Sequence, residues 1–305
     1  MNSLVSHIGL PGSHKGSFVT YTPDTMKLAF STNAYKRYTL EESITSIAEI
    51  GYEGVEILCD IPHAYPPTLN QKEIQSVKNL ISVCHMQISN LNAFSLYAIS
   101  DVYHPSWIEA DKRFRELRLQ HTIDCVQLAE KIGARNISTE PGGPVNINRY
   151  YSNFSIGQLE RLFIKGLSIA AEIAQKSGIK ILVEPEPGLL LENSREFLAF
   201  IKNLSYDSVG LNFDISHFYC VRQDPANLVY QLCEYIGHFH LADIADDRMH
   251  NHLIPGKGSI DFESVFRAIE EVGYKGFVTV ELYPYQDAPI EAAKMAYKYL
   301  NDIIT

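Results

Sequence analysis

The segment IKILVEPEPG spans residues 179–188 and joins a nearly continuous apolar run to two glutamates. Such a run, ended by glycine, is typical of a strand buried on both faces in a parallel sheet covered by helices. The stretch 156–176 before it repeats apolar residues with the 3.6-residue period of an amphipathic helix, and Gly178 ends that helix. A second helix is expected at 195–203. The segment is therefore a strand between two helices.

The same alternation runs through the chain from Met26 onward. The first helix should begin after Thr39, because Glu42 completes a capping box with it. Strands are expected at 28–35, 54–60, 86–94, 134–141, 179–188, 209–217, 237–243 and 276–284. Helices are expected at 40–50, 71–84, 110–132, 156–176, 195–203, 226–236, 262–272 and 290–303. Eight alternating pairs favour one closed (β/α)8 TIM barrel over residues 26–305, rather than an open sheet.

Composition excludes several classes of protein. The chain of 305 residues has a formal net charge of −10, which argues against non-specific binding to nucleic acid or an anionic membrane. No apolar run approaches the roughly 18 residues of a membrane span. Five cysteines without CxxC spacing indicate reduced thiols, so we expect a soluble, cytoplasmic protein. Residues 1–25 lack the apolar core of a signal peptide and are expected to form a flexible extension.

Four titratable residues stand at the ends of the last four predicted strands: Glu184, Asp214, His240 and Glu281. The carboxyl ends of barrel strands meet on one face, where active sites lie. Three carboxylates crowded there would repel one another, and a divalent cation removes that penalty. Three oxygens and one imidazole nitrogen suit Mn²⁺, Mg²⁺, Co²⁺ or Zn²⁺.

Five motifs carry a family resemblance: VEPEPG (183–188), NFDISH (212–217), HFHLAD (238–243), HLIPGKGSIDF (252–262) and VTVELYP (278–284). With them the chain resembles the sugar-phosphate isomerase/epimerase superfamily of xylose-isomerase-like barrels, from about Met26 to the C-terminus. The resemblance implies one divalent ion, Mn²⁺ first among the four candidates. It implies that Glu184, Asp214, His240 and Glu281 bind this ion. Glu184 and Glu281 would also act as acid and base on opposite faces of a small sugar or polyol.

Further side chains are candidates for binding the substrate. His217 completes a DxxH pattern, and would bond a substrate hydroxyl or bind a further metal. His252 opens an HxxxGxG element and is expected to line the pocket, although His250 could do so instead. Arg248 would hold a substrate oxygen, as an arginine of this loop does in ketose epimerases, but its spacing from the preceding motif differs by two residues. The full set of candidates is His217, His252, Arg248, Glu186, His250 and Trp107.

Some alternatives stay open. Glu186 either faces the site or shapes its rim, and Trp107 with Phe94 either forms an apolar wall or packs in the core. Glu56, inward on the second strand, is a further carboxylate candidate, and His238 is expected to be a hydrogen-bonded core residue. The turn at 256–259 could receive a phosphate at a helix N-terminus, but a tight turn capped by Ser259 or Asp261 is the expected reading.

Two carboxylates beside a divalent ion suit proton abstraction α to a carbonyl, through an enediolate. Proton return gives isomerisation or epimerisation, which we expect, whereas loss of a β-hydroxyl gives dehydration, the main alternative. A C-glycoside-cleaving barrel and a non-catalytic polyol-binding barrel are less favoured. An apurinic-site endonuclease is disfavoured because 90–94 and 138–143 lack histidine and the chain is acidic. Homo-oligomers through outer helices stay open, since no helix face specifies one.

Overall fold

Eight parallel strands form a closed barrel in the computed structural model, which describes residues 26–145 and 154–304. Each strand pairs with the next in sequence, and the last pairs with the first. The predicted fold is therefore confirmed. The strands are β1 (Lys27–Ser31), β2 (Gly54–Leu58), β3 (Gln87–Asn92), β4 (Asn136–Thr139), β5 (Lys180–Val183), β6 (Val209–Asp214), β7 (Ile236–Leu241) and β8 (Phe277–Val280).

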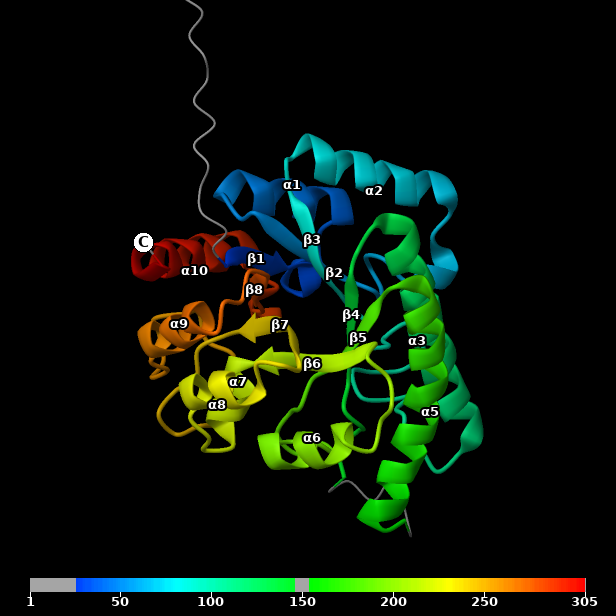
Figure 1. Cartoon of the computed structure of the whole chain (residues 1–305). Coiled ribbons are helices and arrows are strands. Elements are labelled where there is room, and N and C mark those ends of the chain that lie inside the picture. Colours follow the sequence, from blue (N-terminus) through cyan, green and yellow to red (C-terminus); the bar gives the residue numbers. More distant parts are fainter. Residues whose placement is uncertain (1–25, 146–153, 305) are drawn as a thin grey trace, which may run out of the picture.

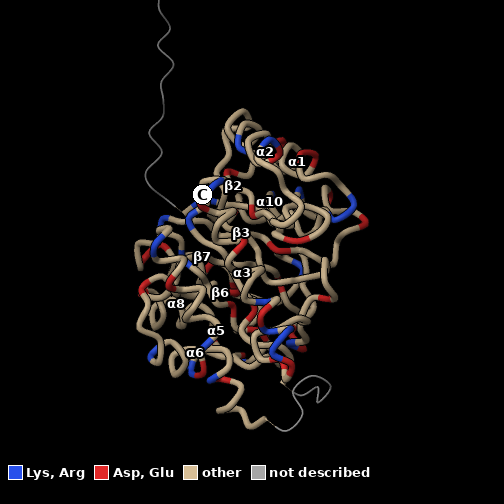
Figure 2. Tube along the Cα trace, turned by 90° about the vertical axis from the view of Figure 1, so that its right-hand side faces the viewer, with Lys and Arg blue, Asp and Glu red and all other residues tan. Residues whose placement is uncertain are grey.

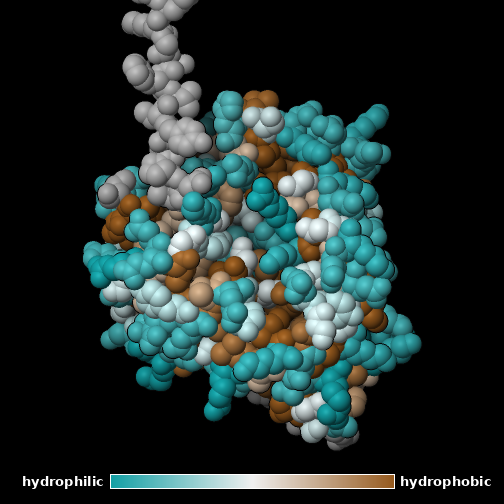
Figure 3. Space-filling model, in the orientation of Figure 1, coloured by the Kyte–Doolittle hydropathy of each residue, from teal (hydrophilic) through white to brown (hydrophobic). Residues whose placement is uncertain are grey.

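Helices surround the barrel on its outer side (Figure 1). They are α1 (Leu40–Ile50), α2 (Gln71–Val83), α3 (Lys112–Ile132), α5 (Ile156–Ser177), α6 (Ser194–Ile201), α7 (Ile215–Cys220), α8 (Pro225–Leu232), α9 (Phe262–Glu271) and α10 (Pro289–Ile304). Lysines, arginines, aspartates and glutamates are interspersed along the outer elements (Figure 2). Mostly hydrophilic residues cover the rim of the face in Figure 3, with hydrophobic residues showing between them. Within the described ranges, no helix has the length and apolar character needed to cross a membrane.

Local sequence signals set the helix ends as predicted. Thr39 Oγ1 accepts the Glu42 backbone N–H, and the Glu42 carboxylate accepts the Thr39 N–H, which is the predicted capping box. Gly51, Gly133 and Gly178 end α1, α3 and α5 in the left-handed conformation that glycine adopts without steric cost. These caps fix where the chain turns back into the barrel.

All eight predicted strands run past the observed carboxyl ends, which lie on the functional face, and two of them show the physical reason. After Ser31 the chain enters a 3-10 turn at Thr32–Tyr35 instead of continuing the strand predicted to residue 35. The strand predicted over 209–217 stops at Asp214, whose carboxylate accepts the N–H groups of Ser216 and His217 and so begins helix α7. A carboxylate that caps the following helix explains why the apolar run stops being a strand there.

The barrel interior is polar below the functional face. His238 Nδ1 donates to Asn212 Oδ1 at 2.8 Å, and its Nε2 lies 2.7 Å from Thr279 Oγ1. Both ring nitrogens are thereby satisfied, as buried polar groups require. The expectation that His238 is a core histidine therefore matches its contacts. The predicted extension at residues 1–25 lies outside the described residues.

Candidate active site and metal centre

The four residues predicted as metal ligands converge at the carboxyl ends of the last four strands. Asp214 ends β6 and His240 lies in β7, while Glu184 and Glu281 directly follow β5 and β8. One oxygen or nitrogen from each lies within 4.8 Å of the others, and all four side chains are buried. Parallel strands in register place these positions at one depth, which is the spatial arrangement predicted.

His240 is held in one orientation by carboxylates on both sides. Its Nδ1 lies 2.9 Å from Glu184 Oε1, and its Nε2 lies 2.6 Å from Glu56 Oε2. Asn90 and Asn92 each donate an amide N–H to Glu56, at 2.8 and 3.1 Å. Burial disfavours a charged imidazole, but Glu184 and Glu56 outweigh it and raise the pKa of His240 well above its ordinary value. Glu56 therefore positions His240 from behind, as carboxylates do for metal-binding histidines.

Glu281 is a buried carboxyl group in a field of negative charge. Asn33 Nδ2 donates to its Oε1 at 2.7 Å, and Asn92 Nδ2 does so at 3.3 Å. Burial, with the charges of Glu184 and Glu56 adding to it, raises the pKa of Glu281 to about 8 despite the opposing effect of the His240 ring. In the absence of a cation, a proton on this group relieves the crowding of charge.

Asp214 has one satisfied oxygen and one orphaned oxygen. Its Oδ1 accepts the Ser216 N–H at 2.7 Å and the His217 N–H at 3.0 Å. Its Oδ2 is buried and has no hydrogen-bond partner among the described residues. Burial favours the neutral acid, but His217 and His252 outweigh it and lower the pKa of Asp214. An anionic oxygen without a donor, beside two further carboxylates and an imidazole, fits a divalent cation.

A cavity of about 140 Å³ opens against this cluster. Its wall includes predicted residues, namely Phe94, Glu184, Glu186, His217, His250 and Glu281. It also includes residues that the sequence did not single out, namely Asn33, Lys36, Leu58, Asn92, Ser95, Tyr97, Val102, Tyr103 and Tyr283. Most of these unpredicted residues lie in the connections after β1 and β3. The sequence of these connections has no motif or regular spacing of polar residues that would mark them. Two of them, Asn33 and Lys36, lie in the TNAYK run after β1; Asn33 was placed inside the predicted first strand, which ended just before Lys36.

Glu186 faces the cavity and forms a short hydrogen bond there. The Tyr103 hydroxyl donates to Glu186 Oε1 at 2.5 Å. Burial chiefly, with the charges of Glu184 and Asp214, raises the pKa of Glu186 to about 7, although His217 opposes the shift. Of the two alternatives for Glu186, facing the site or shaping its rim, the structure agrees with the first.

Two histidines of the loop after β7 take different places. His250 lines the cavity, whereas His252 lies behind it with its Nδ1 2.9 Å from the Glu281 carbonyl oxygen. The two Nε2 atoms are 3.2 Å apart. The alternative in which His250 faces the pocket therefore agrees with the structure better than the first expectation for His252.

Trp107 and Arg248 do not lie on the cavity wall, which corrects both predictions. The Trp107 side chain is 1% exposed, donates its indole N–H to Thr139 Oγ1 at 3.0 Å and packs against Phe163. Arg248 donates to the Tyr219 carbonyl oxygen at 2.8 Å and stacks over the ring of Tyr219 at 4.0 Å. Trp107 is therefore a core residue, and Arg248 anchors its own loop.

The glycine turn at 256–259 holds a carboxylate of the chain itself. The N–H groups of Gly256 and Gly258 donate to Asp243 Oδ2 at 2.9 and 2.7 Å. A side chain at Gly258 would meet Asp243 Oδ1 at 2.4 Å, so only glycine fits. The expected tight turn is correct, and helix α9 is capped by Asp261. The phosphate alternative is wrong at this turn because Asp243 already occupies its donors.

Comparison with known proteins agrees with this architecture. An inosose dehydratase of Clostridium beijerinckii is 24% identical over 286 residues, covering 88% of this chain and 90% of the relative. A fructoselysine 3-epimerase of Shigella flexneri is 25% identical over 278 residues, covering 89% and 95%. The crystal structure of an IolI protein with a binding zinc atom superposes with a TM-score of 0.74 at 19% identity, covering 92% and 98%.

These relatives are enzymes, and they include both a dehydratase and an epimerase. A family model described as xylose isomerase-like TIM barrel matches residues 44–303. The match begins within α1 and takes in every strand from β2 to β8, and with them all four residues of the buried cluster. The chain thus belongs to the xylose isomerase-like TIM-barrel family.

Proposed function

We propose that this chain is a divalent-metal-dependent enzyme that epimerises or isomerises a small ketose or keto-cyclitol by moving a proton α to the carbonyl. The observation that carries this proposal is that Glu184 and Glu281 line the cavity and belong to one buried cluster with Asp214 and His240. The named relatives support the substrate class, because inosose and fructoselysine both contain a ketone beside hydroxyl-bearing carbons. Mn²⁺ is the ion we propose first, since three of the four ligands are carboxylates.

Each residue of the cluster has a role that follows from its contacts. Glu184, Asp214, His240 and Glu281 would hold the ion, which when bound supplies Lewis-acid polarisation of the substrate carbonyl. Glu184 or Glu281 takes the carbon-bound proton on a carboxylate oxygen, and the opposite one, starting as the carboxylic acid, delivers its own proton from the other face. The Asn33 and Asn92 amides fix the position of Glu281 Oε1 during this exchange.

Dehydration is a second candidate, and one specific observation favours it. Loss of a β-hydroxyl requires an acid that protonates the departing oxygen. Glu186 is a cavity carboxyl group whose pKa is raised to about 7, so a large share of it carries a proton at neutral pH. Tyr103 bonds the same carboxyl group and holds it toward the cavity. Both candidates begin with the same α-proton abstraction, and they differ in whether Glu186 then delivers a proton to a leaving hydroxyl.

Exchange of substrate protons with D₂O tests the shared step. Ketoses and keto-inositols would be incubated with the Mn²⁺-loaded enzyme, and deuterium incorporation at the α-carbon measured by NMR. We expect Glu281→Gln to lower the exchange rate at least about 100-fold, the scale of a lost general base. The exposed variant Glu172→Gln is a matched control and should exchange normally. Undiminished exchange in Glu281→Gln would exclude Glu281 from the chemistry.

The same reaction mixtures separate the two candidates. An epimerase yields a product of unchanged mass in H₂O, whereas a dehydratase yields one lighter by a water molecule. If dehydration occurs, Glu186→Gln should keep α-proton exchange and lose the dehydrated product. If Glu186→Gln dehydrates at the normal rate, Glu186 is not the acid and the second candidate loses its support.

A further inference from the structure

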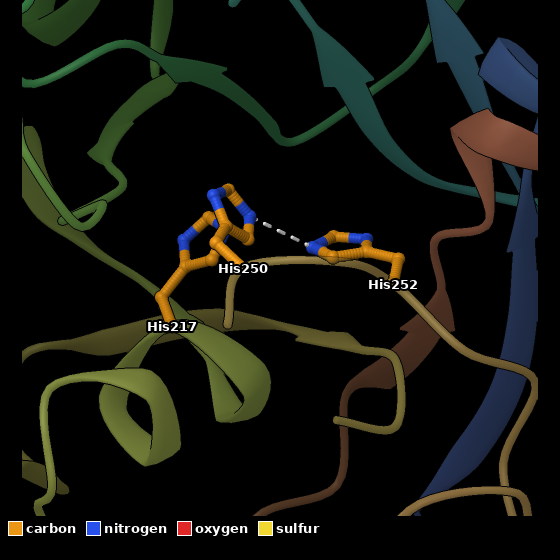
Figure 4. A group of neighbouring side chains, drawn as sticks. All are labelled: His217, His250 and His252. Atoms are coloured by element: carbon orange, nitrogen blue, oxygen red, sulfur yellow. Dashed lines mark hydrogen bonds between the residues drawn. The ribbon is translucent and has the colours of Figure 1, made fainter. Parts of the chain in front are cut away.

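The two sides of the cavity differ in charge. Glu184, Glu186 and Glu281 stand on the side that follows β5 and β8. His217 of helix α7 and His250 of the loop after β7 belong to this side, and their ring centres lie 4.6 Å apart (Figure 4). Among the described residues, the side formed by β1 to β3 and the connections after them has no carboxylate on the wall. The cavity is therefore acidic on one side only.

Lys36 is the one lysine or arginine that the described residues contribute to the cavity wall. It follows the 3-10 turn after β1, and its ammonium group lies 4.2 Å from the centre of the Tyr97 ring. A cation over an aromatic face is held in place while its N–H groups stay free to bond. Within the described ranges, no acceptor bonds this ammonium group and no carboxylate oxygen lies within 4.0 Å of it. Burial lowers the pKa of the Lys36 amine, although the charges of Asp60 and Glu281 oppose the shift.

The carboxylate of Asp60 does not need Lys36, because other donors already bond both of its oxygens. Its Oδ1 accepts the Ala98 N–H at 3.0 Å. Its Oδ2 accepts the Ser95 hydroxyl at 3.0 Å and the Tyr97 N–H. These bonds fix the connection that carries Tyr97, and the Tyr97 ring in turn positions Lys36. Lys36 thus brings N–H donors to the cavity that no group of the described chain uses.

Asn33 supplies a second unsatisfied group on the same side of the cavity. It precedes Lys36 by three residues, is 7% exposed, and donates its Nδ2–H to Glu281 Oε1 at 2.7 Å. Its Oδ1 is buried and has no hydrogen-bond partner among the described residues. A buried acceptor without a donor is costly, so a ligand hydroxyl that bonds it is favoured. The turn after β1 therefore offers an acceptor for a hydroxyl group and a cation for an anion.

We propose that Lys36 selects substrates that carry an anionic group, a carboxylate or a phosphate, on the carbon chain away from the ketone. The proposal rests on the function proposed above, because it concerns the same cavity. Lys36 follows β1, which lies across the closed barrel from β5 and Glu184. An anionic group on the acidic side would be repelled by Glu184 and Glu186, whereas Lys36 attracts it. Lys36 therefore also determines which end of an anionic substrate reaches the buried cluster.

The competing interpretation is that Lys36 only offsets the charge of the acidic side. In that case no ligand group bonds the ammonium group, and the three glutamates on the wall still repel an anion. The unmodified protein would then bind a neutral polyol at least as tightly as a charged one. The two interpretations therefore predict opposite orders of affinity for ligands that differ in a single charged group.

Calorimetry with three unreactive polyols decides between them, on the full chain loaded with Mn²⁺. D-Glucitol is neutral, D-gluconate has a carboxylate in place of one terminal CH₂OH group, and D-glucitol 6-phosphate carries a phosphate. We expect one of the charged ligands to bind at least about tenfold more tightly than D-glucitol, the scale of a hydrogen bond between charged groups. The tighter of the two identifies the anionic group as carboxylate or phosphate.

Variants of Lys36 assign the preference to this side chain. Lys36→Met keeps an aliphatic stem without the charge and should abolish the preference for the charged ligand. Lys36→Arg keeps the charge and should retain it. Lys165 is exposed on helix α5, away from the cavity wall, so Lys165→Met is the matched control and should retain the preference as well. Circular dichroism checks that each variant is folded.

Failure of this inference and failure of the proposed function have different signatures. If a charged ligand keeps its advantage in Lys36→Met, the anion binds elsewhere, for example at the metal, and the role of Lys36 is refuted. Equal affinities of the three polyols in the unmodified protein, or binding of none of them, refute it too. The proposed function fails instead if no ketose, charged or neutral, exchanges its α-proton with D₂O in the unmodified enzyme. That result would leave a Lys36-dependent preference for charged polyols standing as a property of the cavity.

Discussion

Asp243 is the anchor of the loop that carries His250 and His252, and its replacement by asparagine tests the architecture of this face. Its carboxylate is 1% exposed and accepts four backbone N–H groups. Oδ2 receives those of Gly256 and Gly258, at 2.9 and 2.7 Å. Oδ1 receives those of Ile244 and Ile260 at 2.9 and 3.2 Å. One buried side chain therefore bonds the returning loop at four points, in addition to the backbone bonds between Asp243 and Leu253.

The cost of Asp243→Asn follows from these contacts. Asparagine keeps one carbonyl oxygen and replaces the other with an NH₂ group, so two backbone donors face a donor. A buried donor left without an acceptor costs about 1–3 kcal/mol, which gives about 2–6 kcal/mol for two. Because the loop also carries His250 to the cavity wall, we expect a displaced His250 as well as lower stability.

Urea unfolding at pH 7, followed by circular dichroism, measures the free energy of unfolding. Asp261→Asn is the matched control, since Asp261 caps α9 at the end of the same loop by accepting the Ser264 N–H at 3.1 Å. Asparagine caps helices as well as aspartate, so this control should change stability by less than about 0.5 kcal/mol. A loss below about 1 kcal/mol in Asp243→Asn would show that the four bonds do not hold the loop, and would refute the reasoning.

Three further predictions concern groups away from the substrate. Glu56→Gln should weaken Mn²⁺ binding about 10–100-fold by calorimetry, because Glu56 orients His240; unchanged affinity would contradict this. Burial lowers the pKa of His121 from 6.5 to about 3, so its neutral form is favoured in the fold and stability falls as the pH drops from 6.5 toward 3, by up to about 1.4 kcal/mol per unit. His121→Leu should remove that slope in urea titrations at several pH values, and an equal slope would refute it. Arg118→Leu should cost about 3–5 kcal/mol in urea unfolding, because buried Glu140 loses its cation, and a cost under 1 kcal/mol would count against the pair.

The sequence was sufficient for the barrel because each strand and helix carries its own periodicity and its own end signal. The capping box at Thr39 and the glycine at Gly51 are local, and the structure shows both where they were predicted. The clustering of the four candidate ligands could also be predicted, since parallel strands bring their carboxyl ends together. The ends of the strands at Ser31 and Asp214 were predicted too late, because apolar residues continue beyond them. In the structure the side chains of Ser31 and Asp214 accept backbone N–H groups of the next turn, and this ends each strand.

The cavity wall was less accessible to sequence reasoning. Asn33, Lys36 and Tyr103 are single polar residues in connections, and no period or spacing marks them. Trp107 shows the opposite error, because an aromatic residue in a long connection can face either the pocket or the core. The nearby Thr139 hydroxyl accepts its indole N–H and places it in the core, a tertiary contact that no local pattern encodes.

The charge balance of the site links its geometry to its chemistry. Glu56, Glu184 and Glu281 surround His240. Even a positively charged His240 ring therefore balances only one of the three carboxylates. The raised pKa of Glu281, about 8, means that the metal-free protein relieves the excess with a proton on that carboxyl group. A divalent ion would replace this proton and leave Glu281 ionised. The same crowding that calls for a cation therefore also yields, once the cation is bound, a buried carboxylate base facing the cavity.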